Sequence, residues 1–232
     1  MIVFNGVSID SVAPVKIDDI KVSPIRYNPV VRARPVRFGA EFVRMGGGER
    51  VVTVTFALLD MDMNTRHESV LNITKWARSD AEYMLELPMD NIKALFCVCT
   101  AKPEPSTRVW WENKLKLTFT CFNNPYWTSK AQRVVACGTQ FTTFGDAPPL
   151  MEIRRTLSSS ASNQSYSDGT NTMTFSTIPT GDMVIDVNRQ TAVVGTSSIM
   201  QYYTPASNFI LSKVGTQTIT GTGNVNIRER WE

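Results

Sequence analysis

A strict alternation of apolar and polar residues is the feature that most limits how this chain can fold. In the segment KLKLTFTC (114–121) every second residue is apolar. Successive side chains of a β-strand point to opposite faces, so this segment is predicted to be a strand with one buried face. Further strands are predicted over 15–22, 30–44 and 51–59, and the chain is therefore predicted to be mainly β.

Two turn signals separate the predicted strands of the N-terminal half. Asn5–Gly6 suits a type I′ turn, which needs positive φ at both central residues, and it predicts a hairpin over Met1–Asp10. The three glycines within Met45–Glu49 predict a flexible hairpin turn between the strands at 30–44 and 51–59. This glycine run leads into a strand and lacks the following Lys-Ser/Thr, so it is not a phosphate-binding P-loop.

One segment has helical rather than strand periodicity. Thr65 and Glu68 fit a capping box, and an apolar stripe of helical period follows them. The helix is predicted to end near Ser79–Asp80 and to pack on a sheet, with Trp76 as its largest anchor. The preceding DMDMNT mimics the start of a calcium loop but lacks that loop's Gly and Glu, so it is interpreted as a helix lead-in whose negative charge suits the helix dipole.

A domain boundary is predicted near residue 130, which gives domains at 1–130 and 131–232. The segment Gly145–Pro149 is a strong turn signal, and no apolar pattern of helical period follows it. About eight short strands in roughly 100 residues predict a β-sandwich for the second domain. The polar segment Ser158–Asn171 is predicted to be a mobile outer loop of that domain.

The four cysteines, Cys97, Cys99, Cys121 and Cys137, are predicted to be buried, inert thiols. The N-terminus does not have the pattern of a secretory signal, so the chain is expected to fold in the cytosol, where thiols stay reduced. Alternation places Cys97 and Cys99 on one face of a strand, and no paired zinc-ligand spacing is present. No apolar run approaches the roughly 18 residues of a membrane span.

The best candidates for catalysis are two carboxylates, Asp182 and Asp186, in TGDMVIDVNRQTAVV. On a strand they would lie about 13 Å apart, which exceeds the separation of a glycosidase pair and the reach of a shared metal. The single histidine, His67, falls in the first helical turn, where a solvent-facing position is expected. No catalytic, cofactor-binding or metal-binding residue is therefore predicted, and the chain is not expected to be an enzyme.

Arginine is concentrated between residues 26 and 50, a segment that contains six arginines and two glutamates. A nucleic-acid stripe, a solvated strand face and a protein contact surface would all explain this concentration. A net charge of +3 and few interleaved aromatic residues count against nucleic acid, whereas Arg is favoured at protein interfaces. The candidate subunit or partner interface consists of Arg32, Arg34, Arg37 and Arg44.

In order and spacing, these features resemble one known family nearly end to end. In the first domain the resemblance lies in FNG, RPVRFGAEFVRMGGGERVVTVTF, ITKW and LTFTCFNNPYW. In the second it lies in GDAPPLMEI, TGDMVIDVNRQTAVV and the terminal FILSKVGTQTITGTGNVNIRERW. The chain resembles the distal tail proteins (Dit) of long-tailed, siphovirus-type bacteriophages, which form the hub of the phage tail or baseplate.

This resemblance implies a β-rich, ring-forming first domain with one α-helix and a galectin-like β-sandwich as the second domain. It implies a structural protein of the virion tail tip, assembled in the bacterial host cytoplasm. There a hexameric ring would join the end of the tail tube to the tail tip or baseplate that binds the host. The implied partners are further copies of the chain, the tail-tube protein, a tail-tip or tail-associated protein, and tape-measure or receptor-binding proteins. Neither a cofactor, a membrane nor a specific nucleic acid is implied.

Two other functions compete with the hub. The first is a carbohydrate-binding module that contacts the bacterial surface through the C-terminal sandwich. Tyr202, Tyr203 and Trp231 could stack on its sugars, although burial is the commoner fate of such aromatic residues. Larger members of the family carry inserted carbohydrate-binding modules, for which this chain has no room. The second is a glycan hydrolase.

Overall fold

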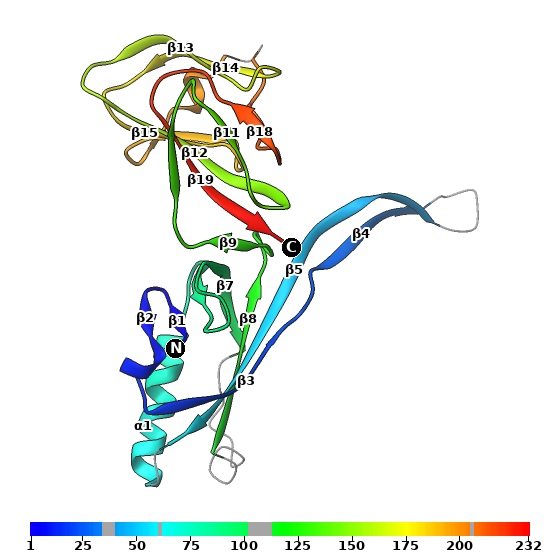
Figure 1. Cartoon of the computed structure of the whole chain (residues 1–232), viewed down its shortest axis with the longest axis vertical. Helices are drawn as coiled ribbons and strands as arrows, with labels where there is room; N and C mark the ends of the chain where they lie inside the picture. The colour runs from blue at the N-terminus through cyan, green and yellow to red at the C-terminus, as the bar shows by residue number, and fades with distance from the viewer. Residues whose placement is uncertain (34–39, 60–61, 102–112, 205–206) are drawn as a thin grey trace. The chain divides into compact units, whose positions relative to one another are not determined.

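The computed structural model describes residues 1–33, 40–59, 62–101, 113–204 and 207–232. These residues divide into two units, Met1–Trp127 and Thr128–Glu232. Both are built mainly from antiparallel strands (Figure 1), so the predicted mainly β fold class is confirmed. Among the described residues, no helix is long and apolar enough to cross a membrane.

The first unit is one antiparallel sheet with a helix packed against it. The sheet has the order β3-β5-β8-β7-β6-β1-β2. Its elements are β1 (Val3–Phe4), β2 (Val7–Ser8), a 3-10 turn η1 (Ile9–Ser11), β3 (Val15–Val22), β4 (Arg26–Ala33), β5 (Ala40–Leu58), α1 (Met63–Trp76), β6 (Tyr83–Glu86), β7 (Lys93–Ala101) and β8 (Lys114–Cys121). The turn between β1 and β2 has φ of 51° at Asn5 and 75° at Gly6, which confirms the predicted Asn-Gly turn.

Strand β5 organises this sheet, because β3 and β8 pair with its two edges. Its apolar residues Val52, Val54 and Phe56 are fully buried, while the threonines between them are only half-buried. The same core contains Leu115, Leu117 and Phe119 of β8 and Val70 and Ile73 of α1. The alternation in the sequence therefore marks the face of the sheet that α1 covers.

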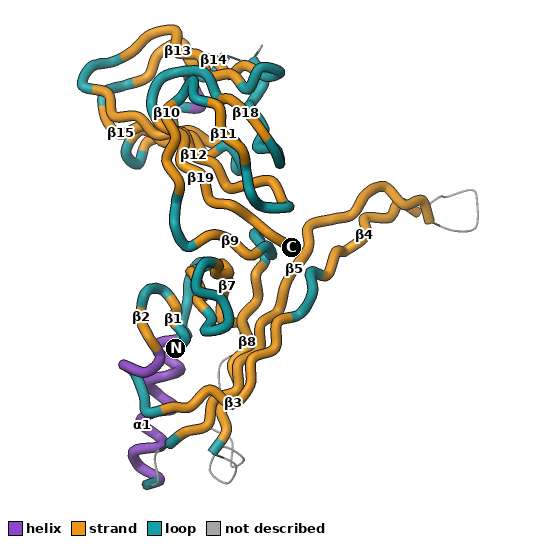
Figure 2. Tube along the Cα trace, in the orientation of Figure 1, coloured by secondary structure: helices purple, strands orange, loops and turns teal. Residues whose placement is uncertain are grey.

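The prediction for residues 30–49 is wrong in two respects. The segment 30–44 is not one strand: β4 ends at Ala33 and β5 begins at Ala40. Nor is Met45–Glu49 a turn, because β5 continues through all three glycines to Leu58 (Figure 2). The opposite segment, formed by Ile25 and the start of β4, explains the glycine at 48. A Cβ there would lie 2.4 Å from Ile25 Cγ2 and 3.2 Å from the Tyr27 ring. A strand can contain Gly where another segment approaches this closely.

The helix begins two residues before the predicted cap. Asp62 is the N-cap, and its Oδ2 accepts from the backbone N–H groups of Asn64 at 3.0 Å and Thr65 at 3.1 Å. A carboxylate at this end also suits the positive end of the helix dipole. Val70 and Ile73 are the buried anchors of α1. Trp76 is only half-buried at the edge of the core, where its indole N–H donates to the Val7 carbonyl at 3.0 Å.

The second unit is a β-sandwich. One sheet has the order β17-β16-β15-β12-β19-β10, and the other layer contains the pairs β11–β18 and β13–β14. Its elements are β9 (Trp127–Ser129), which begins at the last residue of the first unit, β10 (Arg133–Ala136), β11 (Gln140–Thr142), β12 (Ala147–Leu157), β13 (Ala161–Ser167), β14 (Thr172–Ile178), β15 (Gly181–Asp186), β16 (Thr191–Val194), β17 (Ser197–Ser198), a 3-10 turn η2 (Met200–Tyr202), β18 (Thr216–Thr218) and β19 (Asn224–Trp231). Ile153, Ile185 and Ile227 of the large sheet share one core with Phe141 and Phe175 of the other layer.

The prediction of a loop over Ser158–Asn171 is also wrong, because half of this segment, Ala161–Ser167, forms strand β13. Its backbone pairs with β14, and the Ser165 and Thr174 hydroxyls lie 3.1 Å apart across the pair. Tyr166, which is 1% exposed, anchors the strand in the sandwich core. Low-complexity polar composition thus conceals a strand whose one large apolar side chain is buried.

The β13–β14 turn is held by Asp168, whose side chain is 2% exposed. Its Oδ1 accepts from the backbone of Asn171 at 2.6 Å and of Thr170 at 2.8 Å, and its Oδ2 from the backbone of Leu211 at 3.2 Å. Burial alone would raise the pKa of this carboxyl. The N–H groups of Asn171, Thr170 and Leu211 outweigh that effect and lower the pKa to about 2, against an ordinary value of 3.8.

We expect Asp168 to make the second unit acid-sensitive. A pKa lowered on folding stabilises the fold above the unfolded value near 3.8, and the stabilisation is lost as pH falls through about 2. At neutral pH the ionised form contributes about 2 kcal/mol to the free energy of unfolding. Urea unfolding of Asp168→Asn at pH 7 should show a loss of this size, and the difference from wild type should shrink between pH 4 and pH 2. A gap that stays constant over this range would contradict the assignment.

The close approach at Gly48 predicts a coupled pair of substitutions. Gly48→Ala places a methyl group against Ile25 Cγ2, and such overpacking costs about 1–3 kcal/mol. Ile25→Ala removes the obstructing atom, so the double variant should lose less stability than the two single losses added together. Chemical denaturation of the four proteins measures this coupling, and strict additivity would show that β5 yields at Gly48.

Candidate interaction surfaces

The arginines predicted as an interface fall on β4, on β5 and on the connection between these strands. Arg32 of β4 lies in register with Glu41, and Arg44 of β5 lies in register with Val30. The side chains of Arg32 and Arg44 are not among those described, and Arg34 and Arg37 lie outside the described residues. The structure thus assigns Arg32 and Arg44 to one two-stranded ribbon, and their role stays a prediction.

The backbone of this ribbon has an open edge. Residues 50–57 of β5 pair with β8 on one edge and residues 52–58 pair with β3 on the other. β4 follows β3 in the chain and continues along the β3 edge, pairing with β5 residues 40–49. On the β8 edge, residues 40–49 pair with no strand in the described part of the chain. Alternate residues along this ten-residue edge therefore present backbone donors and acceptors for pairing with another strand.

The two other sheet edges in this region are blunted. β3 has a bulge between Ile17 and Asp19, and Asp18, Asp19 and Lys21 on it are exposed. β4 contains Pro29, which has no N–H to donate, and its register shifts on either side of that residue. Bulges, charges and proline are the usual means of preventing edge-to-edge pairing. The open edge of β5 is therefore the better template for an added strand.

The carboxylates Asp182 and Asp186 have separate structural contacts. Asp182 accepts from the Thr156 hydroxyl at 2.6 Å, across to the neighbouring strand β12. Asp186 closes the turn after β15 by accepting from the backbone N–H groups of Asn188 at 3.0 Å and Arg189 at 2.9 Å. Within the described ranges, no group of three or more His, Cys, Asp or Glu side chains is arranged to hold a metal ion.

The cysteines are free, and three of them are buried in the first core. Cys97 and Cys121 are fully buried on the neighbouring strands β7 and β8. Two effects raise the pKa of the Cys97 thiol far above its usual range. The larger is a hydrogen bond with the Cys121 thiol, and the second is burial. Because the thiolate is the reactive form, this cysteine is unsuited to nucleophilic chemistry.

The aromatic residues considered for sugar stacking are engaged with the protein. Tyr202, Tyr203 and Trp231 are all half-buried. The Tyr203 ring packs against Phe175 and Phe209 at centroid distances of 5.8 and 5.7 Å, and its hydroxyl donates to the Ser207 carbonyl at 2.6 Å. No sugar platform is formed by this tyrosine.

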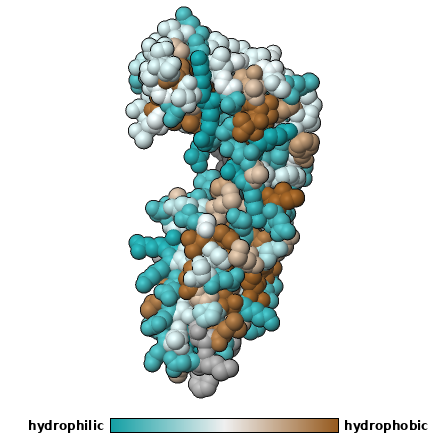
Figure 3. All heavy atoms as spheres, turned by 60° about the vertical axis from the view of Figure 1, so that its left-hand side comes forward, coloured by the Kyte–Doolittle hydropathy of each residue, from teal (hydrophilic) through white to brown (hydrophobic). Residues whose placement is uncertain are grey.

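Within the described residues of the first unit, a shallow depression of about 400 Å³ lies beside α1 and is lined by Phe4, Asn5, Val7, Val12, Asn72, Lys75 and Trp76. On the face drawn in Figure 3, apolar and polar side chains are interspersed over the described residues. The depression is open and its indole N–H is already bonded to Val7. Nothing in its geometry selects a ligand.

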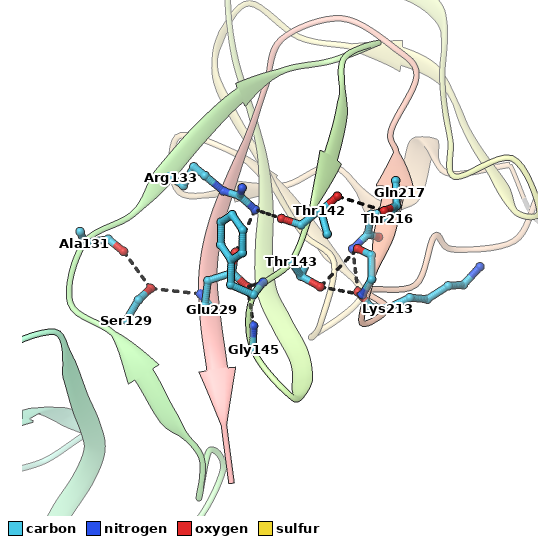
Figure 4. A network of polar contacts seen from close by, with 12 residues as sticks. Ser129, Ala131, Arg133, Thr142, Thr143, Gly145, Lys213, Thr216, Gln217 and Glu229 are labelled. Atoms are coloured by element: carbon cyan, nitrogen blue, oxygen red, sulfur yellow. Dashed lines mark hydrogen bonds and ion pairs between the residues drawn. The ribbon is translucent and has the colours of Figure 1, made fainter.

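A polar network in the second unit was not anticipated from the sequence (Figure 4). At its centre is Glu229 of β19, whose side chain is 9% exposed. Its Oε1 accepts from Arg133 Nη2 at 2.8 Å, and its Oε2 accepts from the Phe144 N–H at 3.1 Å and the Gly145 N–H at 3.4 Å. The Ser129 Oγ accepts from the Glu229 N–H at 3.0 Å. One carboxylate thus ties β10 and the segment after β11 to β19.

The network leaves a large aromatic side chain in solvent. Phe144 is 72% exposed, yet its ring lies over the Arg133 guanidinium at 4.9 Å, and Phe141 lies 5.9 Å from the same group. Besides its two bonds through Nη2, to Glu229 and to the Thr142 carbonyl, Arg133 donates to nothing else in the described chain. The only sequence signal for this site is the pair of Phe residues in FTTFG, which predicts neither the ion pair nor the exposure.

No model of a known protein family matches the chain, and no curated protein matches it in sequence. Its fold, however, matches solved structures. The Dit protein (gp 19.1) of SPP1, described as a paradigm of the hub adsorption apparatus in phages that infect Gram-positive bacteria, aligns with a TM-score of 0.72 at 14% identity. That alignment covers 100% of this chain and 98% of the SPP1 protein.

The baseplate of phage p2 in its activated conformation also matches, in structures with strontium and with calcium. Each alignment has a TM-score of 0.51 at 9% identity and covers 94% of this chain and 91% of the p2 chain. The structural neighbours are therefore phage hub and baseplate proteins. The resemblance predicted from sequence motifs is confirmed at the level of the fold.

The Glu229 network predicts a strong coupling between two side chains. Glu229→Gln leaves Arg133 without a carboxylate partner in a largely buried site and should lower the free energy of unfolding by about 2–3 kcal/mol. Arg133→Met removes the cation, so the loss on adding Glu229→Gln to that variant should be clearly smaller. A double-mutant cycle by urea denaturation measures the coupling, and a value near zero would contradict the network.

Proposed function

We propose that this chain is a structural protein of a bacteriophage tail, and that a hexameric ring of it joins the end of the tail tube to the tail tip or baseplate. The observation that carries the proposal is the fold shared over the whole chain with the Dit protein of SPP1. In this assignment the first unit forms the ring and the second unit is a galectin-like sandwich. The protein acts by shape and by contacts, without a catalytic step.

The open edge of β5 supports ring formation. A closed ring of identical subunits needs two different, complementary surfaces on each subunit. A ten-residue strand edge that is unpaired within the subunit supplies one such surface, since another copy can add a strand to it and satisfy its backbone groups. An isolated two-stranded ribbon is marginally stable in water, so contact with a neighbouring copy would also stabilise it.

The arginines of the ribbon suit the same role. Arg32, Arg34, Arg37 and Arg44 belong to the segment that carries the open edge, or directly connect its strands. Arg is enriched at protein interfaces and makes bidentate contacts with carboxylates. We assign these four residues to the contacts between copies, with the tail-tube protein and tail-tip proteins as the further partners of the ring.

The mass and appearance of the purified protein test the proposed ring. Light scattering after size-exclusion chromatography should give six times the 25.9 kDa chain mass, and negative-stain images should show rings. A monodisperse monomer at high concentration would contradict the proposal.

Shortening the ribbon tests its role in the ring. Pro29 and Met45 are paired, so residues 30–44 can be replaced by an Asn-Gly turn that closes a shorter hairpin. We expect this variant to remain folded, as judged by circular dichroism and thermal unfolding, but to be monomeric. The control variant, Lys16→Glu with Lys21→Glu on the blunted β3 edge, should keep the ring. A ribbon-shortened variant that still forms rings would place the seam elsewhere.

A further inference from the structure

The exposed residue Phe144 and the exposed apolar residue Val214 lie on adjacent segments. β11 pairs with β18 up to Thr142 opposite Thr216. The pairing continues beyond the strands, because the Thr143 N–H donates to the Gly215 carbonyl at 3.1 Å. The next residues along the two segments are Phe144, which follows Thr143, and Val214, which precedes Gly215 and is 49% exposed. We call the surface formed by Phe144, Val214 and Arg133 the Phe144 ledge.

The ledge is held rigidly although its apolar side chains are exposed. The Phe144 N–H is bound to the buried carboxylate of Glu229, and the ring rests on the guanidinium that the same carboxylate binds. Gly145, the residue after Phe144, packs closely against β19. A Cβ on Gly145 would lie 2.0 Å from the Arg230 carbonyl oxygen. Binding to a surface that is already ordered avoids the entropy cost of ordering it. Aromatic residues, Phe among them, and Arg are enriched at protein interfaces.

The charges of the ledge indicate the chemistry of its partner. Glu229 is 9% exposed and Arg133 is 32% exposed, so the cation of this pair reaches solvent while its counter-charge does not. Arg133 Nη1 donates to no described residue. Asp146, two residues after Phe144, is bound to the Glu232 N–H through Oδ1. Within the Arg133–Glu229 pair, the unmet hydrogen-bonding capacity is therefore that of the cationic donor.

We propose that the Phe144 ledge docks a second, different protein of the tail through a segment that carries an apolar side chain next to an Asp or Glu. This inference rests on the proposed function. A second copy that docks ledge to ledge is a poorer occupant, because the Glu229 carboxylate of each ledge is buried and bonded. A sugar is poorer too, because Val214 is apolar and the hydroxyls of Thr142 and Thr216 are bonded to each other at 3.0 Å.

Photo-crosslinking from the ledge identifies its occupant. The photoreactive residue p-benzoylphenylalanine is placed at position 144 of the full chain in assembled tail particles. We expect a crosslink to one other tail protein, at a peptide that contains Asp or Glu. The matched control places the same residue at Val134, which is 58% exposed on β10 next to Arg133, and should not give this product. A crosslink to another copy of the chain would overturn the proposal.

Substitutions at the exposed positions then test the charge and the apolar contact separately. Val214→Glu should weaken binding of the crosslinked protein by at least about tenfold, and Val214→Lys should not. Replacing the partner's acidic residue by Lys should restore binding to Val214→Glu. Phe144→Ser should also lose about tenfold, whereas Val134→Ser should bind as wild type does. Equal effects of Glu and Lys at position 214 would overturn the assigned chemistry.

Two further results separate this inference from the proposed function. If the wild-type chain forms no ring, the proposed function fails whatever the ledge binds. If rings form and Phe144→Ser still yields particles with every tail protein in place, the ledge proposal alone is overturned. A bacterial glycan array run in parallel should show no binding, and a glycan signal that Phe144→Ser abolishes would identify a saccharide as the occupant instead.

Discussion

The hydrogen-bond ladder along β5 is the constraint on which the first unit depends. Over residues 52–57 this strand is paired on both edges, and its alternate residues Val52, Val54 and Phe56 form the middle of the core. Before Arg50 it pairs with the described strands on one edge only. One 19-residue strand is therefore both the centre of a sheet and one half of a ribbon with an open edge. The same backbone that stabilises the subunit offers the surface through which we propose that copies associate.

Carboxylates that accept backbone hydrogen bonds provide a second constraint, because they fix turns and segments that the cores do not reach. Glu82 accepts from the Phe122 and Asn123 N–H groups after β8, and Asp168 holds the β13–β14 turn. Glu229 does the same for the segment that carries Phe144. A carboxylate that accepts several backbone N–H bonds replaces water that burial has removed. These acidic residues thus hold backbone segments in place, which suits the proposed structural role.

The two proposed contact surfaces differ in physical character. The edge of β5 offers a row of backbone groups, which favours strand addition and does not depend on particular side chains. The Phe144 ledge offers two exposed apolar side chains and one cation held by a buried ion pair, which favours a specific partner. The proposed hub would need both kinds of contact, since it would repeat one interaction with its own copies and make a different one with another protein.

The sequence alone determined the mainly β class, the hairpin turn at Asn5–Gly6 and the buried faces of β5 and β8. These features follow from local rules, namely the period of two in a strand and the positive φ that Asn and Gly tolerate. The order of the sequence motifs also predicted a resemblance to the Dit family, and the fold matches that of the Dit protein of SPP1. Local rules failed where long-range contacts dominate. Only the tertiary structure shows that Gly48 lies in a strand. It also shows why this residue is glycine, since Ile25 leaves no room there for a side chain. Only tertiary structure brought Glu229 to Arg133 and Phe144, since residues 85 or more positions apart meet through strand pairing that no local pattern encodes.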